Sequence, residues 1–173
     1  MKALRALFLA TLLAVTCWAK PTDFWKVESE RDAEASVTTF SAKGETMKGQ
    51  GLLVWGRWPA AQPPSERPLD ASVVLAGLYK DLKDFHLLGR KETQWGGRQA
   101  QLVAFRATAQ KRPVVARALL TEGEDGVQVL LLVTNPEAQK DFAKEFDRLQ
   151  KTWDFTRPGA ANVIYSASEP KPK

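Results

Sequence analysis

The sequence predicts an α+β fold in which an antiparallel β-sheet of about six strands is sandwiched between helices. Three observations predict it. Four strand-like segments follow one another between residues 86 and 134, and the links between them are short and turn-prone. The last segment, Val127–Thr134, is apolar on both faces, so both sides of the sheet must be covered. Amphipathic segments near residues 70–85 and 136–153 supply the covering helices.

Two strands are expected before the first helix. Ser36–Ala42 is rich in β-branched residues, and Gly51–Trp58 follows a turn region that contains two glycines. The polar segment 20–35 is expected to lie on the domain through its only large apolar residues. These are Phe24, Trp25 and Val27.

A stiff loop and a helix are expected next. Residues 59–68 contain four prolines, which are excluded from helix interiors and central strands. Asp70 is a good N-cap, and apolar residues then recur at steps of three and four residues. The pattern predicts an amphipathic helix of about four turns that carries Leu75, Leu78, Leu82 and Phe85 on one face.

The second half of the chain is expected to form a meander of strands closed by a helix. The strands are His86–Trp95, Arg98–Thr108, Val114–Thr121 and Val127–Thr134, and their short links make neighbours antiparallel. In the helix, Asn135 is the expected cap and Pro136 the first residue. Its apolar face consists of Phe142, Phe146, Leu149 and Trp153.

The first nineteen residues have the pattern of an export signal. A short basic start precedes an apolar run of about eleven residues, whereas a membrane-spanning helix needs about twenty. Small residues before the junction predict cleavage between Ala19 and Lys20. The prediction is therefore a signal peptide at 1–19, a single α+β domain at 20–155 and a disordered tail at 156–173, in a periplasmic or extracellular protein.

Cys17 leaves one alternative open. If the residues before it served as a lipobox, Cys17 would carry lipid and anchor a structural lipoprotein to a membrane surface. Thr16 argues against this, because lipoprotein signals usually have glycine, alanine or serine at that position. Cleavage at Ala19 would remove the only cysteine, so the exported domain would have no disulfide and no thiolate metal site.

Charge points to no particular partner. Removal of Lys2 and Arg5 with the signal lowers the formal net charge from +5 to +3. No basic stripe interleaved with aromatic residues and no recognition helix is present, so a nucleic-acid partner is not expected. No transmembrane helix is expected in the mature domain either.

The order of elements resembles the PsbP/DcrB group of exported domains. Two features carry the resemblance: Gly97-Arg98-Gln99-Ala100 enters a long strand after a hairpin turn, and a last helix closes with Trp153-Asp154-Phe155. The resemblance covers about residues 36–155, whereas residues 20–35 lack the opening typical of many relatives. It implies an antiparallel sheet between helices and a non-enzymatic accessory protein of the bacterial cell envelope that binds a protein or a small ligand. It carries over no catalytic residue.

No catalytic, cofactor or metal site is predicted. His86 is the only histidine, and a nucleophilic triad would need a base beside a serine elbow that the sequence lacks. The acidic turn Glu122–Gly126 is too short for a calcium loop of the EF-hand type. A small hydrolase that uses two carboxylates stays open as an alternative, because the separation of such groups in space is what defines them.

Tryptophans are the best candidates for binding. Trp95 lies beside a Gly-Gly turn, where a large aromatic side chain can be partly exposed, and Arg98 is close to it in sequence. An aromatic ring beside arginine can stack on a sugar ring or anchor a protein partner. Trp95 and Arg98 are therefore the predicted partner-binding residues, with core packing as the alternative role of the tryptophan.

Overall fold

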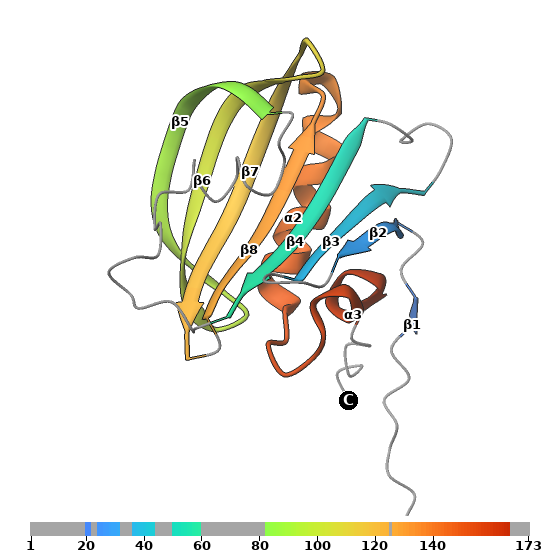
Figure 1. Ribbon diagram of the computed structural model, residues 1–173, viewed down its shortest axis with the longest axis vertical. Coiled ribbons are helices and arrows are strands. Elements are labelled where there is room, and N and C mark those ends of the chain that lie inside the picture. Colours follow the sequence, from blue (N-terminus) through green and yellow to red (C-terminus); the bar gives the residue numbers. More distant parts are fainter. Residues whose placement is uncertain are drawn as a thin grey trace, which may run out of the picture.

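A seven-stranded antiparallel sheet forms the centre of the molecule (Figure 1). The computed structural model describes residues 20–21, 24–31, 36–43, 50–59, 82–124 and 126–166. The sheet has the strand order β2-β3-β4-β8-β7-β6-β5, so β2 and β5 are its edges. Its strands are β2 (Trp25–Arg31), β3 (Ser36–Ala42), β4 (Gly51–Trp58), β5 (Leu82–Trp95), β6 (Arg98–Ala109), β7 (Arg112–Gly123) and β8 (Gly126–Thr134).

The helical elements of the described chain all follow the last strand of this sheet. A single 3-10 turn, η2 (Pro136–Ala138), leads into α2 (Gln139–Thr152), and α3 (Gly159–Ile164) follows. A separate two-stranded ladder pairs β1 (Lys20–Pro21) with β9 (Tyr165–Ser166). None of the helices in these ranges is both long and apolar enough to cross a bilayer.

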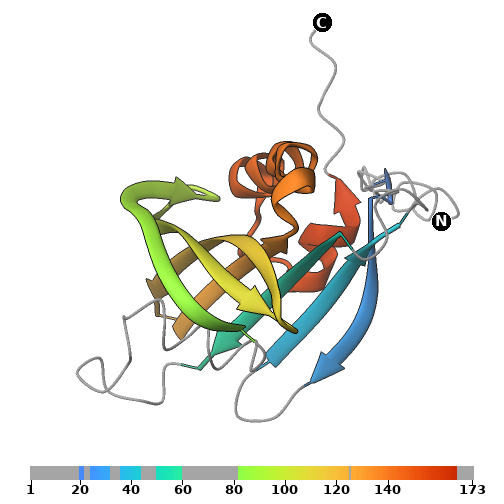
Figure 2. The same cartoon turned by 90° about the horizontal axis from the view of Figure 1, so that it is seen from above.

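Helix α2 lies in the hollow of the curved sheet, as the view from above shows (Figure 2). Its predicted apolar stripe is confirmed, since Phe142, Phe146, Leu149 and Trp153 are all at most 4% exposed. A fully buried side chain of this size contributes about 1.5–3 kcal/mol to the free energy of unfolding. The stripe packs against strand residues that include Phe40, Leu53, Leu130 and Leu132.

The opposite face of the sheet is equally buried. Val54, Val129 and Leu131 lie in a second apolar cluster on that face, and all three are 0% exposed. Every residue of β8 is buried, which confirms the prediction that this strand is covered on both sides. β4 pairs with it along its whole length, and β7 pairs with it from Val115 to Gly123.

Most strand predictions are confirmed. Ser36–Ala42 and Gly51–Trp58 have the predicted bounds, and the strands predicted to start near residues 98, 114 and 127 are observed within two residues of those starts. Side chains alternate along β4, with Trp55 in the apolar cluster that contains α2 and Trp58 packed on the other side of the sheet. Asn135 occupies the N-cap position before η2, although its side chain makes no capping hydrogen bond.

The predicted sandwich of a sheet between helices is wrong. The fold is dominated by one antiparallel sheet, and both described helices pack on the same face of it. The error comes from the stripe that was assigned to a helix at 70–85, because Leu82 and Phe85 belong to β5. The pairing of β5 with β6 is irregular between Lys83 and His86, so Leu82 and Phe85, three positions apart as in a helix, both lie in one strand. The rest of that predicted helix, and the proline-rich loop from residue 60, lie outside the described residues.

Two further elements were not foreseen. Strand β2 pairs with β3 and adds a seventh strand to the sheet. Its Trp25 is buried, whereas its Val27 is 38% exposed. An edge strand with mostly charged, exposed residues lacks the alternation by which a strand is recognised. Helix α3 and β9 lie within residues 156–173, for which a disordered tail was predicted. Val163 of α3 is buried in the apolar cluster that contains α2. Residues 167–173 and the predicted signal 1–19 lie outside the described ranges.

The ring of Phe142 in α2 lies directly against Gly51 of β4. A Cβ atom at this position would overlap the ring of Phe142, whereas a Cβ atom at Gly89, in β5, would meet nothing. We expect Gly51→Ala to lower the free energy of unfolding by about 1–3 kcal/mol, the usual cost of overpacking. Gly89→Ala is the matched control, because it tests the same change in a strand without the overlap. Urea unfolding of both variants measures the difference, and equal stability of the two would contradict this account.

Candidate functional site

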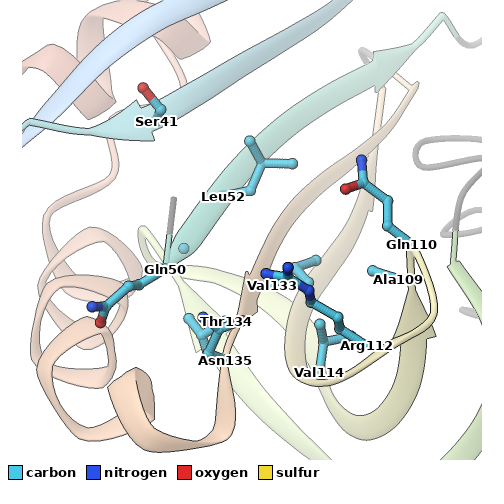
Figure 3. Close-up of a pocket in the computed structure, with 11 residues that line it drawn as sticks. Ser41, Gln50, Leu52, Ala109, Gln110, Arg112, Val114, Val133, Thr134 and Asn135 are labelled. Atoms are coloured by element: carbon cyan, nitrogen blue, oxygen red, sulfur yellow. The ribbon is translucent and has the colours of Figure 1, made fainter. Parts of the chain in front are cut away.

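A pocket of about 220 Å³ opens at the end of the sheet where β8 stops and β4 begins (Figure 3). Pairing of these two strands ends at Gly51 and Thr134. The amide N–H of Asn135 donates to the carbonyl of Gln50 at 2.9 Å, which ties the two chain segments together beyond the last pair. The other lining residues come from the end of β3, the β6–β7 turn and the start of β7: Ser41, Ala109, Gln110, Arg112 and Val114.

The β6–β7 turn gives the pocket one wall. Gln110 and Lys111 both have positive φ, 49° and 64°, between the paired residues Ala109 and Arg112. Two central residues with positive φ form the type of two-residue turn that matches the twist of a hairpin, usually with glycine or asparagine. Here neither is present, so the conformation costs about 1 kcal/mol or more at each residue. The tight turn places the side chains of Gln110 and Arg112 on the pocket wall (Figure 3).

The pocket combines an apolar floor with a polar, positively charged wall. Leu52, Val114 and Val133 belong to the apolar cluster on the sheet face opposite α2. Arg112 is exposed and forms no ion pair with any described residue. Among the described lining residues none is aspartate or glutamate, so Arg112 gives the site a net positive charge. Such a site suits a small molecule with an anionic head and an apolar body.

The predicted partner-binding residues, Trp95 and Arg98, lie away from the pocket, where β5 ends and β6 begins. Trp95 is 0% exposed, and its ring centroid lies 4.8 Å from that of Trp153 and 5.2 Å from that of Phe155. The guanidinium of Arg98 lies 4.0 Å above the ring of Phe155, a stabilising cation–π contact. Trp95 therefore offers no surface to a partner in this structure and anchors the end of α2 instead. Its indole N–H is the one buried side-chain donor in the described ranges without a hydrogen-bond partner.

The other sequence candidates do not assemble into a catalytic centre. His86 lies within β5, paired with Arg106, and is exposed. In the turn between β7 and β8, Gly123 pairs with Gly126, and Asp125 lies outside the described residues. No group of three or more potential metal ligands occurs in the described part of the chain.

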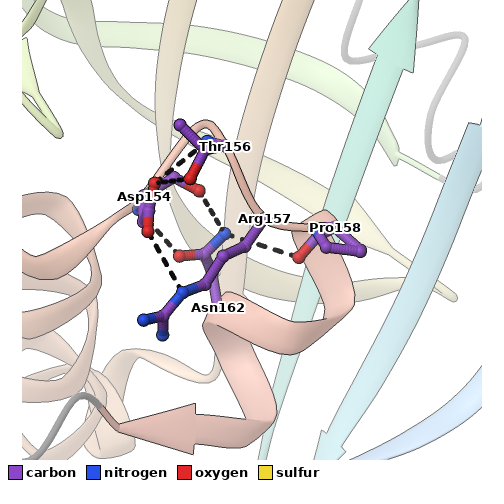
Figure 4. A network of polar contacts seen from close by, with 5 residues as sticks. All are labelled: Asp154, Thr156, Arg157, Pro158 and Asn162. Atoms are coloured by element: carbon purple, nitrogen blue, oxygen red, sulfur yellow. Dashed lines mark hydrogen bonds and ion pairs between the residues drawn. The ribbon is translucent and has the colours of Figure 1, made fainter. Parts of the chain in front are cut away.

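A polar network that was not foreseen joins α2 to α3 (Figure 4). The carboxylate of Asp154 accepts hydrogen bonds from the amide of Thr156 at 2.9 Å and from its hydroxyl at 2.6 Å. Asn162, which is buried, accepts from the amide of Asp154 at 2.7 Å and donates to its carbonyl at 2.9 Å. Arg157 adds an ion pair at 3.1 Å. The only signal in the sequence is the spacing Asp-x-Thr, which is typical of turns.

This network lowers the pKa of Asp154. The hydrogen bonds from the hydroxyl and the amide of Thr156 lower the pKa of Asp154 below its ordinary value of 3.8, with a smaller contribution from Arg157. The shift reflects a fixed turn that holds α3 against the core. Asp154 is paired within the turn and is not in the pocket, so we assign it a structural role.

Comparison with known proteins gives a fold but no family. No family model matches the chain, and no curated protein matches it. The chain is similar to the crystal structure of PA94, a protein of unknown function from Pseudomonas aeruginosa, with 17% identity and a TM-score of 0.54. The match covers 78% of this chain and 99% of that chain. At this level of identity the likeness shows a common fold alone.

A second solved structure bears on the resemblance to the PsbP/DcrB group. The solution structure of the cyanobacterial PsbP protein CyanoP, from Synechocystis sp. PCC 6803, matches with 10% identity and a TM-score of 0.43. The match covers 74% of this chain and 90% of that chain. A match with a TM-score below 0.5 carries no argument about the resemblance.

The pKa of Asp154 provides a test of the network. Replacement of Thr156 by valine removes the hydroxyl bond, and we expect the pKa of Asp154 to rise toward 3.8, whereas Thr156→Ser should keep it low. Because the pKa of Asp154 is lower in the folded state, its carboxylate stabilises the folded protein fully at pH values above 3.8. This stabilisation is lost as the pH falls through the lowered pKa. NMR titration of the carboxyl carbon checks this. An unchanged pKa in the valine variant would contradict the assignment.

Proposed function

We propose that this protein is a non-enzymatic binding protein of the bacterial cell envelope, and that the pocket at the end of the sheet holds a small anionic amphiphile. The observation that carries the proposal is a floor formed by Leu52, Val114 and Val133 beside the guanidinium of Arg112, which forms no ion pair with any described residue. A carboxylate or similar head group would bind the guanidinium through charge-assisted hydrogen bonds. Its apolar body would cover the floor.

The size of the pocket limits the ligand. Its volume of about 220 Å³ is below the range of roughly 300–1,000 Å³ that is typical of sites for drug-sized ligands. A short-chain carboxylate fits this volume better than a long lipid or a polymer. The amide groups of Gln50, Gln110 and Asn135 add donors and acceptors that can orient the head group.

The described lining does not favour hydrolysis. A hydrolase that depends on two carboxylates needs both groups in one cleft, and none of the described lining residues is acidic. The described lining has two hydroxyl groups, those of Ser41 and Thr134. The Ser41 hydroxyl donates to Glu28, and Glu28 is itself paired with Lys26 at 2.8 Å. The Thr134 hydroxyl is buried and donates to the carbonyl of Val115. Neither hydroxyl is paired with a histidine.

Binding of hexanoate tests the pocket. We expect saturable NMR shifts at Leu52, Val114 and Val133, and weaker binding of hexanol, which lacks the charge. Arg112→Gln should raise the Kd about tenfold, because a hydrogen bond to a charged group contributes about 1.5–3 kcal/mol. Lys111→Gln is the matched control, since it removes an adjacent positive charge from a residue outside the lining. The proposal fails if no compound of a carboxylate series binds saturably, or if Arg112→Gln binds as tightly as the native protein.

Export is the second part of the proposal. Cleavage between Ala19 and Lys20 would leave the whole described part of the chain, including β1, in the mature protein. We expect expression in a bacterial host to yield a periplasmic or secreted form whose intact mass begins at Lys20. A mass that begins at an acylated Cys17 would show a lipoprotein instead. Retention of the uncleaved chain in the cytoplasm would contradict export.

A further inference from the structure

The positive charge of the chain is concentrated on one side of the sheet. Residues 82–112 contain seven lysine or arginine residues and two acidic residues, an excess of five, which equals the formal net charge of the whole chain. The rest of the sequence is balanced. These residues form β5, β6 and the turn that follows, at one edge of the sheet (Figure 1).

Four of these cations surround the edge strand, and we call them the basic edge: Lys83, Arg90, Lys91 and Arg106. All four are exposed. Within the described ranges none forms an ion pair, whereas the acidic Glu92 of the same strand accepts a hydrogen bond from Gln101. The four cations outnumber the two exposed carboxylates of the same strand, Asp84 and Glu92, so the basic edge keeps an excess of positive charge.

The same strand exposes large apolar side chains. Of the four large hydrophobic residues that are exposed in the described chain, Phe85, Leu87 and Leu88 lie in β5, with exposed fractions of 36%, 56% and 49%. Edge strands are commonly protected by charge, and exposed aliphatic side chains on them are a liability unless they bind something. Phe85 also rests on Phe105 of β6, with ring centroids 5.2 Å apart, which holds the strand against the sheet.

The backbone of the first half of β5, where its exposed apolar side chains lie, is poorly suited to receive another strand. Its pairing with β6 shifts register between Lys83 and His86 and again between Leu87 and Gly89, and Asp84 has a φ of 54°. Such irregularities twist an edge and interrupt the row of free hydrogen-bonding groups that an added strand requires. An acidic peptide that extends the sheet is thus disfavoured, while the side chains remain available.

We propose that β5 docks on an anionic lipid surface. Because β5 is the outermost strand, side chains from both of its faces reach the same edge of the molecule. Leu87 and Leu88 would enter the interfacial region of the bilayer, and the basic edge would lie against anionic head groups. Apolar side chains flanked by cations are the combination by which peripheral proteins bind such membranes. The inference does not depend on the proposed ligand pocket, because it rests on other residues.

Sedimentation with vesicles tests the docking. We expect the full chain, after signal removal, to bind phosphatidylcholine vesicles that contain phosphatidylglycerol, to bind pure phosphatidylcholine weakly, and to be released by salt. Arg90→Gln with Lys91→Gln should weaken partitioning about 25-fold, because each cation near an anionic surface contributes about fivefold. Leu87→Ser with Leu88→Ser should weaken it about tenfold or more.

Matched controls separate this surface from the rest of the protein. Val27→Ser changes the exposed apolar residue of the other edge strand, and Lys140→Gln with Lys144→Gln removes two exposed charges from α2. Both controls should bind vesicles within about twofold of the native protein, as expected for changes away from the interface. Thermal unfolding of the β5 variants confirms their fold, and their hexanoate binding should be unchanged, so that failure of the pocket and failure of the docking are distinguishable.

Three results would overturn the proposal. They are no binding to the anionic vesicles, equal loss in the control variants, and full binding of the leucine double variant. In the last case, competition by soluble polyglutamate would show an acidic polymer as the partner in place of a membrane.

Discussion

The packing of α2 into the hollow of the sheet is the interaction on which the rest of the structure depends. Phe142, Phe146 and Leu149 bury almost completely between strands that are far apart in sequence. The sheet must curve to enclose them, and the ring of Phe142 lies so close to Gly51 that a Cβ atom there would overlap it. Burial of β8 on both faces follows from its central place behind this helix.

The two ends of α2 are fixed by different means. At its start, Asn135 is tied to Gln50 by a backbone hydrogen bond, and the pocket lies beside this junction. At its end, Trp153 packs on Trp95, and the Asp154 turn then directs the chain into α3. Along one side, Glu145 accepts a hydrogen bond from Trp25 at 3.2 Å and thereby holds the edge strand β2. The chemistry proposed for this protein lies where this central packing stops: at the open end of the sheet and along β5, most of whose length α2 leaves exposed.

Much of the sheet could be predicted from the sequence, while the candidate site could not. Strands β3, β4, β6, β7 and β8 have strong local signals, because β-branched and apolar runs between short turns leave few alternatives. The pocket has no such signal. Its described lining joins residues from five separate segments, and the one charged residue among them, Arg112, has the sequence context of an ordinary turn. Trp95 is the opposite case: its place beside a glycine turn suggested a binding residue, but in the structure its side chain is buried against Trp153 and Phe155.

The sequence by itself determined the antiparallel meander, the double burial of β8 and the apolar stripe of α2, because each depends on the periodicity of neighbouring side chains. Only the tertiary structure decided which elements cover which face, where β5 begins, and that Trp25 and Val163 belong to the core. These depend on contacts between residues far apart along the chain. A spacing of three and four residues suits a helix and a bulged strand equally well, and the partner that each side chain finds on folding decides between them.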